Sequence, residues 1–175
     1  MTQIRKSTEQ DKEAINNLFM TCYGYDWNLI SPLTNLDDRY YLMFMDDLLV
    51  AMTGLGYSDE YKAMEVDWTC THPDHRHRGY MSTLFGVMLQ DVNEIAYCSC
   101  WRLPSQDKPN LGSIMDLYGF KKVINGRHHW QSPHNCHCAD KCSFSTGTGC
   151  DCFEDLYMRD TSNAGFPARK QNGQS

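Results

Sequence analysis

The chain has 175 residues, a net charge of −6 at pH 7, and 41% hydrophobic and 22% charged residues. This length is enough for one domain with a hydrophobic core, and the composition is ordinary for a soluble globular protein. The acidic balance argues against a broad nucleic-acid surface, which needs a basic face, and weakly favours a cationic substrate such as an amine.

No apolar run is long enough to span a bilayer, and residues 1–12 lack the apolar core of a signal peptide. We therefore expect a cytoplasmic protein, in which thiols stay reduced. Nine cysteines are many for such a chain. Their number is odd, which argues against a disulfide framework and favours metal binding or another special use.

The first half of the chain predicts a strand, a helix and then a hairpin. Residues 3–6 form the strand, and Ser7 and Thr8 precede acidic residues that indicate a helix start with a capping box. Apolar residues then recur at helical spacing to about Tyr23. Residues 25–38 mix Pro, Asn and Asp with apolar residues, which predicts a loop or a short second helix.

Two apolar, β-prone ranges, 39–45 and 48–57, flank Asp46 and Asp47, which predicts a hairpin with a turn less specific than Asn-Gly. A fourth strand follows over residues 62–71. Residues 80–92 place their apolar side chains on one stripe of a helix, whose members we expect in the core.

The second half continues with a strand over residues 95–103, a short helix over 111–117 and strands over 120–129 and 153–159. This order is typical of an α/β domain with a mostly antiparallel start. We expect one domain over residues 1–160, and a polar tail over 161–175 that is disordered.

One segment, residues 71–82, joins the fourth strand to the following helix through a loop that contains Arg76, Arg78 and Gly79. A strand that turns through such a loop into a helix can bind phosphate, because free backbone N–H groups and the positive end of the helix dipole point at one place. On these residues alone, a solvated turn is an equal alternative.

The segment resembles the acyl-CoA signature of the GCN5-related N-acetyltransferase (GNAT) family, with Pro73, Arg76 and Gly79 in place and Met81 where a small residue is usual. Residues 110–120 resemble a later signature of the family, an Asn that opens a helix closed by Gly-Phe. The resemblance implies a mixed, largely antiparallel central sheet flanked by helices. In this chain a Cys-rich loop precedes the last predicted strand.

The resemblance also implies that the chain transfers an acetyl group from acetyl-CoA to an amine. A backbone N–H near Cys70 or Thr71 would bind the acetyl carbonyl. Asn110 would orient the pantetheine arm or only cap its helix. The pyrophosphate would be bound by residues of the loop and the first helical turn: Arg76, His77, Arg78, Gly79, Tyr80, Met81 and Ser82.

Three side chains are candidates for proton transfer. Glu65 and Asp67 share one face of the fourth strand, and one of them would accept a proton from the amine; the family often has Glu there, which slightly favours Glu65. The alternative is a solvated face near a sheet edge. Tyr118 would protonate the leaving thiolate through a shifted register, since the family's Tyr falls near Met115, or it is a packing aromatic.

A cysteine cluster lies at about residues 134–152, before the last strand. A structural zinc ion is our leading interpretation, and a disulfide-bonded or redox-active loop and unliganded thiols are the alternatives. In the family fold this loop lies on the acceptor side of the site. The candidate ligands are Cys136, Cys138, Cys142, Cys150 and Cys152.

Two function classes follow. The first is an N-acetyltransferase, and the second is a GNAT-fold binding module whose zinc-stapled loop binds a protein or nucleic-acid partner. The sequence does not identify the acceptor, which could be a small molecule or a protein amine, and it leaves a homo-oligomer open.

Overall fold

The computed structural model describes residues 1–24, 26, 35–59, 62–92, 96–102, 107, 109–127 and 153–159. Within these residues, seven strands form one sheet in the order β1-β2-β3-β4-β5-β7-β6. The strands are β1 (Thr2–Lys6), β2 (Tyr40–Met45), β3 (Leu48–Ser58), β4 (Ala63–Thr71), β5 (Ala96–Arg102), β6 (Lys121–Arg127) and β7 (Phe153–Arg159). The helices are α1 (Lys12–Tyr23), α2 (Tyr80–Met88) and α3 (Gly112–Leu117).

All neighbouring strands are antiparallel except β4 and β5, which are parallel. The predicted fold class, a mixed and largely antiparallel sheet flanked by helices, is therefore confirmed.

The predicted loop or helix before β2, the cysteine cluster and the C-terminal tail lie largely or wholly outside the described residues. No helix in the described part of the chain is long and apolar enough to cross a membrane.

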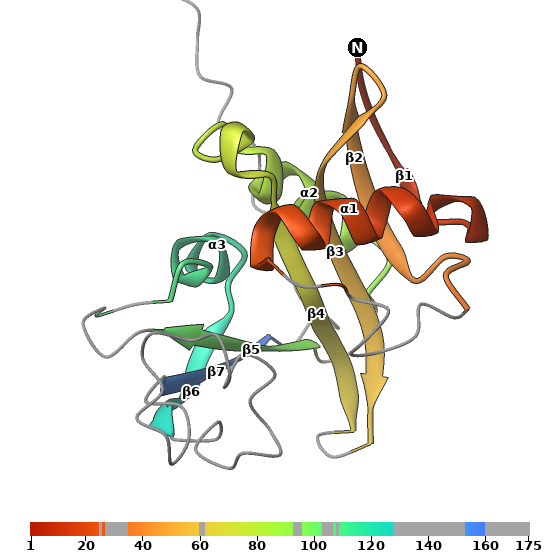
Figure 1. Ribbon diagram of the computed structural model, residues 1–175. Helices are drawn as coiled ribbons and strands as arrows, with labels where there is room; N and C mark the ends of the chain where they lie inside the picture. Colours follow the sequence, from red (N-terminus) through yellow and green to blue (C-terminus); the bar gives the residue numbers. More distant parts are fainter. Residues whose placement is uncertain are drawn as a thin grey trace, which may run out of the picture.

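The helices cover opposite faces of the sheet, and α1 crosses β3 and β4 in Figure 1. Because successive strand residues point to opposite faces, β2 contributes to both layers: Tyr40 packs in the cluster beneath α1, and Tyr41 packs in the cluster beneath α2. The stripe predicted for α2 is buried as expected, and it packs with Met115 of α3. The core thus has two layers, separated by the sheet.

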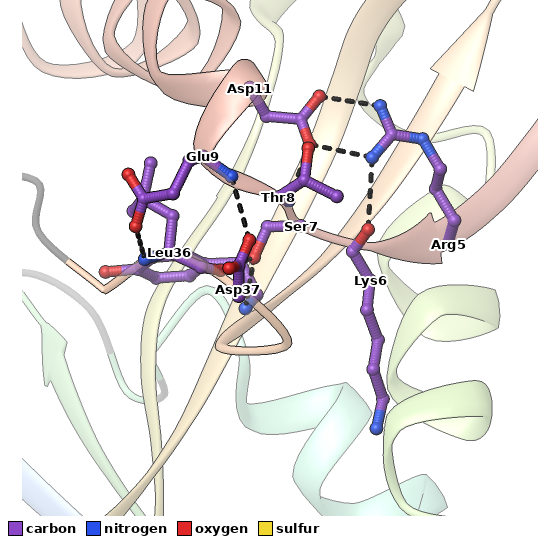
Figure 2. A network of polar contacts seen from close by, with 9 residues as sticks. Arg5, Lys6, Ser7, Thr8, Glu9, Asp11, Leu36 and Asp37 are labelled. Atoms are coloured by element: carbon purple, nitrogen blue, oxygen red, sulfur yellow. Dashed lines mark hydrogen bonds and ion pairs between the residues drawn. The ribbon is translucent and has the colours of Figure 1, made fainter.

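The start of the helical region is fixed by a polar network (Figure 2). The Arg5 guanidinium donates two hydrogen bonds to the Asp11 carboxylate, at 2.7 and 2.6 Å. Asp11 also accepts from the Thr8 backbone N–H at 2.8 Å and the Thr8 hydroxyl at 2.9 Å, so it takes the place of Glu in the predicted capping box. These contacts join the end of β1 to the turn that begins α1.

The same network holds the segment that leads into β2. The Leu36 N–H donates to Glu9 at 2.7 Å, the Glu9 N–H donates to Asp37 at 3.0 Å, and the Tyr40 N–H donates to the Ser7 hydroxyl at 2.9 Å. Ser7 in turn donates to the Leu36 carbonyl. Residues 36–40 are therefore positioned by Ser7 and Glu9, which lie between β1 and α1 (Figure 2).

The hairpin between β2 and β3 forms at the predicted place. Asp46 and Asp47 have φ values of 46° and 70°, and two successive left-handed residues make the turn that suits the twist of paired strands. The next helix differs from its prediction, because α2 ends at Met88 rather than at residue 92. Leu89 and Val92 are nevertheless buried. Because the apolar pattern continues past Met88, the sequence does not show where the helix ends.

β4 has an irregularity that the sequence pattern does not show. Gly54 of β3 pairs with Asp67, and Met52 pairs with Cys70, so one residue of β3 faces two of β4. This is a β-bulge at Trp68 and Thr69, and Trp68 has a φ of 43°. β5 pairs with β4 only as far as Val66 and then turns away from it (Figure 1).

Candidate active site

The loop before α2 ends in an uncapped helix N-terminus. Gly79 is the N-cap residue, with a φ of 77° and no side chain to cap the helix. Among the described residues, no group accepts a hydrogen bond from the backbone N–H groups of Gly79, Tyr80, Met81 or Ser82. Four free donors at the positive end of a helix dipole make an anion-binding position.

The arginines of this loop hold its shape. Arg76 donates from Nε to the Thr71 carbonyl at 3.3 Å, and Arg78 donates from Nη2 to the Asp74 carbonyl at 3.1 Å. Both side chains are exposed. His77 is exposed beside them with a φ of 60°. The loop therefore offers cationic groups around the free amides.

Met81 does not crowd this position. Its side chain is 8% exposed and packs in the cluster beneath α2, as its place in the apolar stripe predicts. Only the backbone of Met81 is then available to a ligand at the helix N-terminus. The departure from a small residue is accommodated by turning the side chain into the core.

The end of β4 adjoins the loop. Cys70 is buried beneath α1, and the Thr71 carbonyl accepts both from Arg76 and from the Cys22 thiol of α1, the latter at 3.4 Å. The Thr69 carbonyl accepts from the Tyr23 hydroxyl at 3.1 Å. The bulge and these contacts place the backbone of residues 69–71 between the last turn of α1 and the loop before α2.

The two candidate carboxylates lie on the face of the sheet that α1 occupies. Val66 between them packs in the cluster beneath α2, so Glu65 and Asp67 point the other way, as predicted. Glu65 is half-buried and faces Gly56 of β3 and Tyr97 of β5 in the sheet register. The predicted pair is thus brought together where β4 and β5 part.

Asp67 lies between Arg39 and Gly54. Its side chain is 17% exposed, and its Oδ2 lies 3.6 Å from Arg39 Nη2. Oδ1 is buried and has no hydrogen-bond partner among the described residues. The carboxylate lies on Gly54, where a Cβ would come within 1.8 Å of Oδ1. A residue larger than glycine at position 54 would displace it.

These surroundings change the acidity of Asp67. Burial raises the pKa of its carboxyl to about 6, the Glu65 charge adds to this, and Arg39 opposes it. Burial and the Asp67 charge also raise the pKa of the neighbouring Tyr40 to about 12. Asp67 can therefore exchange a proton near neutral pH, while Tyr40 keeps its proton.

Sequence reasoning missed Arg39 and Gly54. The only signal was a Gly-x-Gly in one predicted strand beside an acid-x-acid in the next. Reading it requires the register between β3 and β4, which the bulge shifts. Arg39 lies just before β2, with its guanidinium carbon 5.3 Å from the centre of the Tyr40 ring.

Tyr118, the candidate acid, lies between α3 and α2. Its hydroxyl donates to the Ser82 carbonyl at 2.6 Å and occupies the space beside Gly86, where a Cβ would come within 2.7 Å of the oxygen. Asn110 is exposed in the turn before α3, and the N-cap of that helix is Leu111. Tyr118 therefore joins α3 to the first turns of α2.

The predicted zinc ligands lie outside the described residues. In the parts of the chain that the structure describes, no group of three or more His, Cys, Asp or Glu side chains could hold a metal ion.

Residues 12–118 match the model of the acetyltransferase (GNAT) family. The chain belongs to this family. No curated protein sequence matches the chain.

Solved structures of acetyltransferases share the fold. A GNAT family acetyltransferase from Bacillus cereus is 14% identical with a TM-score of 0.66, over 91% of this chain and 97% of that one. The ribosomal-protein-S18-alanine N-acetyltransferase of Escherichia coli is 12% identical with a TM-score of 0.67, over 94% and 97%. At such identities these GNAT structures show the fold alone.

A third structure includes a ligand. N-acetylglutamate synthase from Neisseria gonorrhoeae, in complex with coenzyme A and N-acetyl-glutamate, is 13% identical with a TM-score of 0.56; the match covers 92% of this chain and 35% of that one.

Proposed function

We propose that the chain is an N-acetyltransferase that transfers the acetyl group of acetyl-CoA to an amine by direct attack. The observation that carries the proposal is the uncapped N-terminus of α2 at Gly79, beside the point where β4 and β5 part. Membership of the acetyltransferase family supports the same assignment.

Acetyl-CoA would bind as a substrate along the end of β4. The pyrophosphate would accept hydrogen bonds from the free amides of residues 79–82, with Arg76 and Arg78 adding positive charge. Gly79 leaves the backbone open, since nothing lies within 4 Å of the position of its absent Cβ. A backbone N–H at Cys70 or Thr71 would donate to the thioester oxygen, where negative charge develops during attack.

We assign the general base to Asp67, with Glu65 as the neighbouring charge that raises its pKa. An ammonium acceptor with a pKa near 10.4 must lose a proton before its nitrogen can attack the carbonyl carbon. A largely buried carboxylate with a pKa of about 6 is mostly ionised at pH 7, and its Oδ1 has no partner in the described part of the chain, so it can accept that proton directly or through water. The sequence slightly favoured Glu65, and this buried oxygen favours Asp67 instead.

Attack by the neutral amine forms the N–C bond, and the C–S bond then breaks to release the coenzyme A thiolate. Tyr118 remains the sequence-based prediction for the group that protonates this thiolate. That role requires its hydroxyl to exchange the Ser82 carbonyl for the leaving sulfur. Because a packing role keeps the observed hydrogen bond, we propose the packing role for Tyr118.

The proposal is tested by measuring thiol release from acetyl-CoA with a panel of primary amines, including a lysine-containing peptide and small polyamines. We expect release that depends on both the enzyme and an amine. Acetyl-CoA that binds without thiol release in the presence of any amine would contradict an enzyme and support the binding module.

A further inference from the structure

Two cysteines distant in sequence meet where α1 packs on β4. Cys22 is in the last turn of α1, and Cys70 is near the end of β4. The Cys22 thiol lies 3.4 Å from the carbonyl of Thr71, the residue that follows Cys70. Cys70 is 7% exposed in the apolar cluster beneath α1, and Cys22 is half-buried at the edge of that cluster. One thiol is therefore partly accessible and the other is enclosed behind it.

A cation lies beside this pair. Arg76 donates from Nε to the same Thr71 carbonyl that accepts from Cys22, so the guanidinium and the Cys22 thiol converge on one oxygen. The C-terminal end of α1 disfavours a thiolate, because the negative end of the helix dipole lies there. The positive charge that favours a thiolate at this position comes from Arg76.

The surroundings act in opposite directions on the two thiols. The Cys70 side chain and the Arg76 guanidinium lower the pKa of the Cys22 thiol against the effect of burial. The Cys22 side chain and complete burial raise the pKa of the Cys70 thiol. An accessible, more acidic thiol in front of an enclosed second thiol is the arrangement of an attacking and a resolving cysteine.

We propose that Cys22 and Cys70 are a peroxide-reactive thiol pair that forms a disulfide between α1 and β4. The Cys22 thiolate attacks one oxygen of hydrogen peroxide; the S–O bond forms, the O–O bond breaks, and Cys22 becomes a sulfenic acid. The departing hydroxide takes up the proton that the Cys22 thiol lost and leaves as water. Cys70 then attacks the Cys22 sulfur; the S–O bond breaks, the S–S bond forms, and a second water leaves. Two thiols and one peroxide give one disulfide and two waters, whether or not the chain binds acetyl-CoA.

The chain contains a matched pair for comparison. Cys98 and Cys100 of β5 have thiols 3.5 Å apart, and both are buried. Their side chains are two residues apart on one strand, and the neighbouring Cys100 thiol and burial raise the pKa of Cys98. In both pairs a neighbouring thiol shifts the pKa of a cysteine, whereas partial exposure and a neighbouring arginine distinguish Cys22 and Cys70.

The test treats the reduced full-length protein with one equivalent of hydrogen peroxide, alkylates the remaining thiols and maps the peptides by mass spectrometry without reduction. We expect a Cys22–Cys70 linked peptide as the first disulfide among the nine cysteines, while Cys98 and Cys100 are recovered alkylated. A different first disulfide, with Cys22 still a free thiol, would overturn the proposal. This wild-type measurement decides without any variant.

Three variants assign the roles. Cys70→Ala should leave Cys22 as a sulfenic acid that dimedone labels, and Cys22→Ser should leave Cys70 unlabelled. Arg76→Gln should slow the oxidation of Cys22 by about threefold to tenfold, because the thiolate fraction follows the pKa. Absence of the dimedone adduct in a folded Cys70→Ala protein, or an unchanged rate in Arg76→Gln, would contradict the roles assigned here.

Discussion

At the level of single residues, Asp67 combines burial, an oxygen that has no partner among the residues the structure describes, and a facing arginine. Natural proteins rarely bury such a group without a use, because an unsatisfied buried oxygen destabilises the fold. Glu65 shares its face and acts on Asp67 through its charge. The structure therefore distinguishes the surroundings of two carboxylates that the sequence could only pair.

Asp67→Asn should lower kcat by about 10²-fold to 10⁴-fold, since general base catalysis contributes that much. In the wild type, kcat/KM should rise with pH through about 6 as Asp67 ionises. Glu65→Gln removes the charge that helps raise this pKa, so the inflection should move to lower pH while most turnover remains. Measurement of kcat/KM from pH 5 to 8 checks these outcomes. Full turnover in Asp67→Asn would place the base elsewhere.

Stability should follow the same titration with the opposite sign. The folded-state pKa of about 6 lies above the ordinary value of 3.8, so the folded protein holds the Asp67 proton more tightly than the unfolded chain. The contribution of protonated Asp67 to the free energy of unfolding is fully present below about pH 4 and is lost as the pH rises through about 6. Thermal unfolding of Asp67→Asn should lack this decline.

Gly54→Ala should displace the Asp67 carboxylate, because the new methyl would lie 1.8 Å from Oδ1. We expect kcat to fall by roughly 10²-fold, the cost of a misplaced catalytic group. Gly56→Ala is the matched control: it lies on the same strand and face, and its Cβ would be 4.0 Å from Oδ2, an ordinary contact. Steady-state kinetics of both variants decide; equal kcat values would show that Gly54 does not position the carboxylate.

At the level of the elements, the apolar and turn patterns predicted each described strand and helix. The boundaries were less certain where the pattern continues beyond the hydrogen bonds, as at Leu89 and Val92 after α2. The bulge at Trp68 and Thr69 could not be predicted, because strand periodicity carries no mark of one extra residue. The ion pair between Arg39 and Asp67 depends on the registers of β2 with β3 and of β3 with β4. It could not be predicted either, because the bulge changes the second of these registers.

Tyr118 belongs to this scale because its hydroxyl joins α3 to α2 through Ser82 and fills the space beside Gly86. We predict that Tyr118→Phe lowers the free energy of unfolding by about 1 kcal/mol, the net value of one hydrogen bond. kcat should stay within about threefold of the wild type, far from the loss expected of a general acid. Denaturant unfolding and initial rates test both. A fall of about 10²-fold in kcat with unchanged stability would identify Tyr118 as the acid.

At the level of the whole molecule, the order of elements and two short motifs were enough to predict the family, which the match over residues 12–118 then showed. The loop before α2 could be located from sequence because its residues are contiguous. The surroundings of Asp67 could not, because Gly54 lies on another strand and Arg39 lies in the turn before β2. The cysteine cluster follows β6 in the chain, and its zinc assignment stays a prediction.

The central claim is that the N-terminus of α2 binds acetyl-CoA, and calorimetric measurement of acetyl-CoA affinity tests it most directly. Gly79 and Gly24 have nearly equal φ values, 77° and 78°, and neither has an atom within 4 Å of its absent Cβ. Replacing either by Ala should cost about 1 kcal/mol of stability or more. Gly79→Ala should also weaken acetyl-CoA binding by at least about tenfold, which is 1.4 kcal/mol. Gly24→Ala changes the C-cap of α1 and none of the amides of residues 79–82, so it should bind acetyl-CoA as the wild type does. No saturable binding by the wild type at millimolar acetyl-CoA, or equal affinities in the two variants, would contradict the claim.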